Sequence, residues 1–258
     1  MVAAEKPRLL INVPYDMVQE NLARLTALGV GAEIYLDNGA VGEVGVDDAR
    51  KVGRELMERG ILCTVHAPYM DLSPGGVDRD VRRLTQEKLK KAVDISLALG
   101  AAGIVCHGGY DKWRFDDHEE WWLESSVETW GAVLKDAGDD LPVIIENIFE
   151  ETPATLIALL DHFREKNLWF CFDTGHFNLF TAVPLESWLT PLKGRLKEFH
   201  IHDNHGRSDE HLPVGQGTFP FRELRHLTRS LHEVLFTAEA ADVDSAMETI
   251  RCAKEFLY

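Results

Sequence analysis

The chain has 258 residues, 45% of them hydrophobic, and a formal net charge of −16 at pH 7 from 27 basic and 43 acidic side chains. A chain of this length can bury a substantial core, and α/β barrels of this size form one domain. The acidic balance provides no basic surface for nucleic acid or an anionic membrane, which argues against DNA binding without excluding it. Because the sequence contains neither an apolar run of about 18 residues nor a signal-peptide pattern, we expect a cytoplasmic protein without a membrane partner.

Short apolar segments alternate with longer amphipathic segments along the whole chain. The apolar segments predict eight strands, near residues 8–14, 32–37, 61–67, 103–107, 142–147, 169–173, 197–203 and 233–239. The other segments predict helices, near residues 21–28, 47–59, 78–99, 118–137, 152 onward, 184–195, 221–230 and 243–256, with Thr152 as an N-cap before Pro153. Such apolar strands suit a parallel sheet covered by helices. The pattern predicts a single α/β domain over residues 1–258, a (β/α)8 TIM barrel.

Residues that can bind divalent metal recur where a predicted strand passes into the next loop. There are nine of them: His66, His107, Glu146, Asp173, His176, His200, Asp209, His211 and Glu239. In a (β/α)8 barrel the carboxyl ends of the strands meet at one rim, so these side chains would converge there. Imidazole and carboxylate groups are typical ligands of zinc. The sequence therefore predicts a metal cluster at the rim.

Two glutamates end apolar strands, Glu146 in V-I-I-E-N and Glu239 in L-F-T-A-E-A. An unpaired carboxylate next to a core costs roughly several kcal/mol unless it is paired or bound to metal. A salt bridge to a barrel-interior Arg or Lys is the structural alternative, but the strand ends offer almost no basic residues. The sequence therefore favours a functional role for both glutamates.

The other candidates are weaker when taken singly. D-T-G-H, which contains Asp173 and His176, is also typical of a plain turn between a strand and a helix. His200 and His202 lie two apart on one strand and so face the same side, where one could bind metal while the other supports it or contacts substrate. The glycines at 215 and 217 could offer N–H groups to a phosphate, although a glycine turn is the simpler interpretation. The remaining histidines, at positions 118, 162, 205, 226 and 232, are assigned to the surface.

Taken in order, these motifs resemble the xylose-isomerase-like TIM-barrel superfamily over residues 8–258. They are V-H-A-P-Y, V-C-H-G-G, I-I-E-N, F-D-T-G-H, H-I-H-D-N, D-E-H-L-P-V-G-Q-G and the late glutamate. The superfamily joins sugar and sugar-phosphate isomerases and epimerases with the endonuclease IV nucleases (AP endonuclease family 2), which act on abasic-site DNA. Each motif is loose, and their order and spacing make the resemblance specific.

The two branches imply different metal sites. In the epimerase branch, the resemblance implies a single Mn²⁺ or Zn²⁺ held by Glu146, Asp173, His200 and Glu239, with the two glutamates as the acid/base pair. The pattern H-x-x-D/E selects His200 over His202. In the endonuclease IV branch, three zinc ions use nine ligands, and all nine candidates match that set. The implied cofactor is thus one to three divalent ions, Zn²⁺ before Mn²⁺.

The chain departs from endonuclease IV where that family inserts side chains into DNA. Tyr69 and Met70 stand at one such place, but the loop after the second strand contains no arginine, and the segment between His200 and Asp209 is short. These departures and the acidic charge favour a small substrate. We therefore expect a metal-dependent sugar or sugar-phosphate isomerase or epimerase. The alternative is a multinuclear zinc phosphoesterase acting on abasic-site DNA or a small phosphodiester, and a ligand-binding barrel without activity is a third hypothesis.

Overall fold

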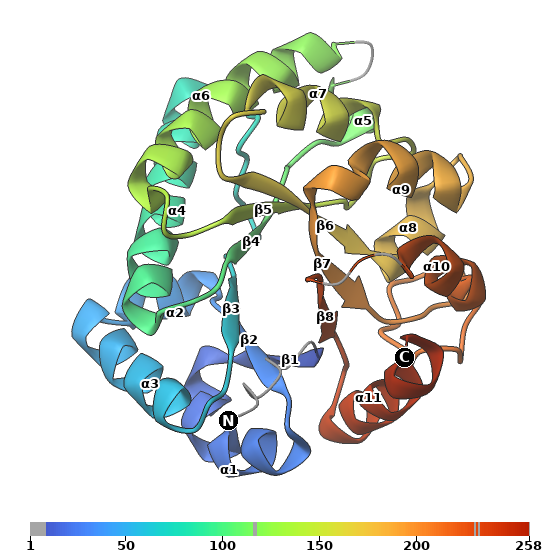
Figure 1. Cartoon of the computed structure of the whole chain (residues 1–258). Helices are drawn as coiled ribbons and strands as arrows, with labels where there is room; N and C mark the ends of the chain where they lie inside the picture. Colours follow the sequence, from blue (N-terminus) through green and yellow to red (C-terminus); the bar gives the residue numbers. More distant parts are fainter. Residues whose placement is uncertain (1–8, 116–117, 230, 232, 258) are drawn as a thin grey trace.

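The structure is a computed structural model that describes residues 9–115, 118–229, 231 and 233–257. Its parallel strands close into a barrel, in which each strand pairs with the next one along the chain and β8 pairs with β1 (Figure 1). The strands are β1 (Leu9–Pro14), β2 (Gly31–Tyr35), β3 (Cys63–His66), β4 (Ile104–His107), β5 (Val143–Glu146), β6 (Leu168–Asp173), β7 (Leu196–Ile201) and β8 (Leu235–Ala238). Every predicted strand is present, and the predicted (β/α)8 barrel is confirmed.

Helices surround the barrel and cover its outer face (Figure 1). They are α1 (Val18–Leu28), α2 (Asn38–Glu43), α3 (Val46–Glu58), α4 (Arg79–Leu99), α5 (Lys112–Phe115), α6 (Glu119–Ala137), α7 (Ala154–His162), α8 (Thr174–Phe180), α9 (Leu185–Leu192), α10 (Phe221–Thr228) and α11 (Val243–Leu257). Two 3₁₀ turns, η1 (Tyr15–Met17) and η2 (Lys193–Arg195), adjoin α1 and α9. Within the described ranges, no helix has the length and apolar character that crossing a bilayer requires.

Helix boundaries follow local chemistry where the sequence supplies a cap. The Asp78 carboxylate accepts hydrogen bonds from the N–H groups of Asp80 and Val81 at the start of α4, and Gly100 ends this helix with a left-handed φ of 70°. The predicted N-cap of α7 is wrong by one residue. Pro153 occupies the cap position and the helix begins at Ala154, while the Thr152 hydroxyl still accepts from the Ala154 N–H at 3.5 Å.

Three short helices, α2, α5 and α8, were not predicted, and all lie in loops that follow strands. α8 matters most for the site because the Asp173 carboxylate accepts a hydrogen bond from the His176 N–H at 2.6 Å and caps the helix. D-T-G-H is therefore the start of a helix, which corrects the turn interpretation. Asp37 caps α2 in the same way, through the Ala40 N–H.

The apolar core lies between the strands and the surrounding helices. Its largest members are the indole rings of Trp122, Trp130 and Trp188, which are fully buried. The interior of the barrel below the rim is polar instead. Glu33 and Glu198 project into it and are completely buried, together with hydroxyl groups from neighbouring strands. This polar layer lies directly beneath the predicted metal cluster.

Candidate metal centre

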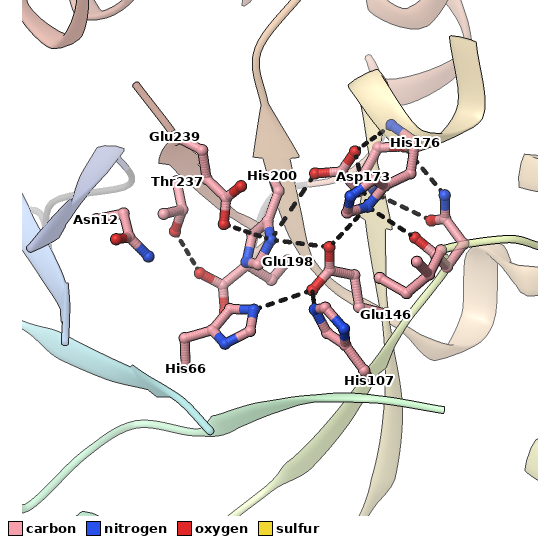
Figure 2. Close-up of polar contacts among 12 residues, drawn as sticks. Asn12, His66, His107, Glu146, Asp173, His176, Glu198, His200, Thr237 and Glu239 are labelled. Carbon is pink, nitrogen blue, oxygen red and sulfur yellow. Dashed lines mark hydrogen bonds and ion pairs between the residues drawn. The ribbon is translucent and has the colours of Figure 1, made fainter. Parts of the chain in front are cut away.

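The nine predicted ligands come together at the carboxyl end of the barrel, as Figure 2 shows for seven of them. They surround a pocket of about 720 Å³, which seven of the nine line directly: His66, His107, Glu146, His176, Asp209, His211 and Glu239. Asp173 and His200 lie behind this lining and are fully buried. The carboxyl ends of β3 to β8, the start of α8 and the loop after β7 thus bring every candidate to one place.

Glu146 at the end of β5 lies at the middle of the cluster, and its two oxygens face different histidines (Figure 2). Oε2 is 3.2 Å from the Nε2 of His66 and 3.5 Å from that of His107. Oε1 is 3.4 Å from His200 Nδ1 and 3.1 Å from His176 Nδ1, and it has no hydrogen-bond partner in the structure. No Lys or Arg among the described residues forms an ion pair with Glu146, so the salt-bridge alternative is wrong.

Glu146 and the two histidines that face its Oε2 atom, His66 and His107, form a first group of candidate ligands. The charges in this group depend on one another. Burial alone would raise the pKa of Glu146, but the neighbouring imidazoles, His200 foremost, hold that pKa well below its usual value. Burial lowers the pKa of His107 to about 4, which makes its ring neutral at pH 7. Burial also opposes protonation of His66, yet the Glu146 carboxylate raises its pKa to about 9. The His66 Nδ1–H donates to the Ala67 carbonyl at 2.9 Å, which leaves Nε2 facing Glu146.

A second group surrounds the Nδ1 atom of His200. This nitrogen lies 3.1 Å from Glu239 Oε1, 3.4 Å from Glu146 Oε1 and 3.9 Å from Asp173 Oδ2. Ligand atoms bound at 2.0–2.1 Å around a tetrahedral ion are separated by about 3.3 Å, so these spacings suit one ion. His200 Nδ1 and Glu146 Oε1 are buried without hydrogen-bond partners, which is costly unless something satisfies both. A divalent cation fits that requirement.

A third group forms around Asp209 in the loop that follows β7. Its Oδ2 lies 3.1 Å from His211 Nε2 and 3.6 Å from His176 Nε2. Burial opposes ionisation of Asp209, but hydrogen bonds from His176 and His211 hold its pKa well below the usual value. The His176 Nδ1–H donates to the Asn147 carbonyl at 3.1 Å and leaves Nε2 facing Asp209. All nine predicted residues therefore belong to one of three adjoining groups.

A buried carboxylate pair beneath the cluster was not predicted from the sequence. Glu33 Oε2 lies 3.2 Å from His200 Nε2, and Asn12 donates to Glu33 Oε1 at 3.1 Å. The Thr237 hydroxyl donates to Glu198. Burial and the negative charge of Glu33 raise the pKa of Glu198 to about 8, so the pair carries one negative charge at pH 7. Glu198 lies two residues before His200 on β7 and therefore faces the same side, a signal that the sequence already contained.

Asp203 holds the loop that carries the third group. Its buried carboxylate accepts hydrogen bonds from the N–H groups of Asn204, Gly215, Gly217 and Phe219, at 2.9 to 3.1 Å. The glycine N–H groups considered for phosphate binding are therefore bonded within the protein, and the glycine-turn interpretation is correct. The backbones of Asp203 and Leu212 also pair as an antiparallel bridge around the intervening loop.

Aromatic side chains form the mouth of the pocket. The Tyr69 ring stacks on His107 with centroids 4.3 Å apart, and Phe149 contacts Phe180 edge-to-face at 5.1 Å. Among the described residues that line the pocket, Arg207 is the one arginine or lysine. The surface assignment is correct for the histidines at positions 118, 162, 205 and 226, while His232 lies outside the described residues.

Residues 23–256 match the family described as a xylose isomerase-like TIM barrel. The chain belongs to this family. The resemblance inferred from the motifs is thereby confirmed. An uncharacterized protein of Methanocaldococcus jannaschii is 28% identical over 215 residues, which cover 79% of this chain and 73% of that protein. A "Probable endonuclease 4" of Mycobacterium leprae is 28% identical over 167 residues, 59% of this chain and 63% of that relative. The chain therefore matches less than two thirds of that endonuclease.

Two solved structures show the same fold over nearly the whole chain. A D-tagatose 3-epimerase-like protein superposes with a TM-score of 0.81 at 22% identity, covering 97% of each chain. The TTHB071 protein from Thermus thermophilus, solved after soaking with ZnCl2, gives a TM-score of 0.79 at 23% identity, with 96% of this chain and 97% of that chain covered. At such identity the likeness establishes the fold alone.

Proposed function

We propose that this chain is a phosphoester hydrolase that depends on more than one divalent metal ion. One observation carries the proposal: the two oxygens of Glu146 face two different groups of histidines, at 3.1 to 3.5 Å. A single carboxylate shared in this way suits two neighbouring ions, which a one-metal isomerase does not require. The sequence ranked the isomerase or epimerase first, and the surroundings of Glu146 lead us to place the hydrolase above it.

The first ion would be held by His66, His107 and Glu146, and the second by Glu146, Asp173, His200 and Glu239. Zinc suits these mixed imidazole and carboxylate ligands, and manganese is the alternative. Paired ions activate water near neutral pH and stabilise the attacking and leaving oxygens of a phosphoester. Two contacts hold the histidines of the first ion in place. His66 is hydrogen-bonded to the Ala67 carbonyl, and His107 is stacked against the Tyr69 ring.

The pocket favours a small phosphoester over DNA. Its volume of about 720 Å³ lies within the range typical of small-molecule sites. The aromatic mouth, including Tyr69 and Phe149, would exclude water around the reacting group and contact an apolar part of the substrate. Arg207 places positive charge beside the mouth, where it would attract an anionic phosphate. The net charge of −16 disfavours a long polyanion.

The isomerase or epimerase remains the second candidate. It is supported by the approach of both Glu146 and Glu239 to His200 Nδ1, since two carboxylates beside one ion can act as an acid/base pair. Two features weigh against it. Glu146 is engaged by four imidazoles, which reduces its freedom to move a proton, and an isomerase has no evident use for Asp209 and His211.

Metal content separates the two candidates. Protein purified without chelator should contain two or three zinc or manganese ions per chain by elemental analysis. It should hydrolyse bis(p-nitrophenyl) phosphate or another small phosphoester more readily than an abasic-site oligonucleotide. Glu146→Gln should lose both the ions and the activity, while Glu124→Gln, on the exposed face of α6, should retain them. One ion per chain combined with epimerisation of a ketose or sugar phosphate would overturn the proposal in favour of the second candidate.

A further inference from the structure

His202, which the motif pattern ranks below His200, lies directly beside the third group. Its ring is completely buried, just past the end of β7. The Nε2 atom lies 3.0 Å from Asp173 Oδ2, and Nδ1 lies 3.6 Å from Asp209 Oδ1. Nδ1 has no hydrogen-bond partner in the structure. The ring therefore joins a carboxylate of the second group to the carboxylate at the centre of the third.

The contact with Asp173 determines which nitrogen of His202 is free to bind. An ionised carboxylate can only accept a hydrogen bond, so Nε2 carries the proton and donates it to Asp173. In that tautomer Nδ1 keeps a lone pair, and it lies 3.6 Å from Asp209 Oδ1. A buried nitrogen without a donor is unfavourable unless another group satisfies it, and a metal ion is such a group.

The chain is shaped to hold this ring in place. A Cβ atom on Gly175 would lie 2.0 Å from His202 Cε1 and 2.5 Å from Nδ1, so the third residue of D-T-G-H has to be glycine because the ring occupies that space. Thr174 Oγ1 donates to the His202 carbonyl at 2.6 Å and accepts from its N–H at 3.1 Å. The His211 ring stacks on the His202 ring, with centroids 4.2 Å apart.

We propose that His202 is a tenth metal ligand, which binds through Nδ1 the ion that His176, Asp209 and His211 surround. Ligand atoms of His202, Asp209 and His211 lie within 4.8 Å of one another, and His176 Nε2 faces the same carboxylate. Four protein ligands complete the tetrahedral coordination of zinc and leave no position for water or substrate. This inference rests on the proposed multi-metal function and deepens it: the third ion is structural, and the chemistry belongs to the two ions that share Glu146.

A competing assignment uses the other nitrogen. His202 Nε2 lies 3.9 Å from Glu239 Oε2, so it could instead join the second group beside Asp173. In either assignment His202→Gln removes a ligand, and the ion that is lost shows which group His202 belongs to. The glutamine amide can still donate to Asp173, so the variant also distinguishes a ligand from a residue that acts through its hydrogen bond alone. If His202 acts only through its hydrogen bond to Asp173, glutamine should preserve metal binding.

The experiment counts zinc in the full-length protein after equilibration in buffers of defined free Zn²⁺. We expect three ions per chain in the unchanged protein and two in His202→Gln, with the third ion bound about 100-fold more weakly or worse. The double variant Asp209→Ala, His211→Ala should also retain two, and adding His202→Gln to it should remove no further ion. His205→Gln, an exposed histidine on the same loop, should keep all three.

Three further measurements guard against misfolding as an explanation. Thermal unfolding of the metal-free variants should match that of the metal-free parent protein. Gly175→Ala, which keeps the imidazole but displaces it, should lose the same ion. With Co²⁺ in place of zinc, His202→Gln should lose part of the strong visible absorption of four-coordinate cobalt.

An unchanged zinc count and affinity in His202→Gln would overturn the proposal. Loss of a second ion from the triple variant would also overturn it, because His202 would then belong to the second group. If the unchanged protein binds a single ion, the proposed function fails together with this inference. Three ions in both the parent and His202→Gln would refute the inference alone.

Discussion

The Glu33 carboxylate offers a direct test of how the barrel interior supports the second group of ligands. Its Oε2 atom lies 3.2 Å from His200 Nε2, and both side chains are fully buried. Because the carboxylate accepts, the proton of His200 resides on Nε2 and Nδ1 is left to face Glu239. Burial opposes the negative charge on Glu33, but His200 lowers the Glu33 pKa below its usual value, so the carboxylate is ionised at pH 7.

The expected size of the effect follows from this contact. Removing a partner that orients a metal-binding histidine lowers metal affinity by about 10- to 100-fold, which is roughly 1.4–2.7 kcal/mol. Glu33→Gln keeps the volume of the side chain and its contact with Asn12, and it removes the charge. We therefore expect the ion beside His200 to dissociate about 10- to 100-fold more readily, while the ion beside Asp209 is retained as before.

Competition with a chromophoric chelator measures both affinities in one titration. Glu58→Gln, at the exposed end of α3, is the matched control and should match the parent protein. An unchanged affinity in Glu33→Gln would refute the argument that this carboxylate orients His200. Equal weakening of every ion would point instead to a general loosening of the barrel.

Three further predictions concern the stability of the fold and of the loop after β7. Phe172→Ala should lower the free energy of unfolding by about 3–5 kcal/mol and the midpoint of thermal unfolding by roughly 10 °C, because the fully buried Phe172 ring contacts several other aromatic rings. Glu150→Gln should stabilise the protein at pH 8 by up to about 3 kcal/mol relative to its effect at pH 4, because burial raises the pKa of Glu150 to about 7. Asp203→Asn should speed amide hydrogen exchange at Gly215 and Gly217, measured by mass spectrometry, and should weaken the ion at Asp209 while sparing the ions that share Glu146.

The sign of the Glu150 effect follows from proton linkage. The unfolded carboxyl loses its proton near pH 4.5 and the folded one near pH 7, so between these values the folded state holds the extra proton and stability falls as pH rises. Denaturant titrations should give a flatter profile between pH 5 and 7 for Glu150→Gln, and parallel profiles would contradict the prediction. Phe149→Ala, whose ring is half exposed, is the control for Phe172→Ala and should cost far less.

The sequence was sufficient to predict the barrel and the clustering of the candidate ligands at its rim. An apolar run that ends in His, Asp or Glu marks both a strand and the direction of its last side chain, which is why this pattern selects Glu146 and His107. Glu33 and Glu198 lie in the middle of their strands, so a pattern based on strand ends does not select them, although the two-residue alternation places them inside the barrel.

Other features depend on contacts that a linear pattern does not contain. The Asp173 carboxylate both lies in the candidate metal centre and caps α8, and the helix is too short to show a periodic pattern. The free nitrogen of His202 is determined by its contact with Asp173 at the end of β6, and the position of its ring by Gly175 in α8 and His211 in a loop. Similarly, Asp203 is one acidic residue among many in sequence, and only the folded loop brings its four N–H donors together.

The acidic side chains of the pocket couple the binding of metal to the binding of substrate. Four carboxylates, those of Glu146, Asp173, Asp209 and Glu239, lie around one small volume, and against the effect of burial they raise the pKa of the neighbouring His176 and His200 rings, so that protons balance part of their charge when no metal is bound. The proposed ions would replace these protons, and their added positive charge would favour the binding of an anionic substrate. Thermodynamic reciprocity then requires the substrate to tighten the ions by the same factor by which the ions tighten the substrate. Turnover and resistance to chelators would be coupled, so the protein would release metal most readily when no substrate is present.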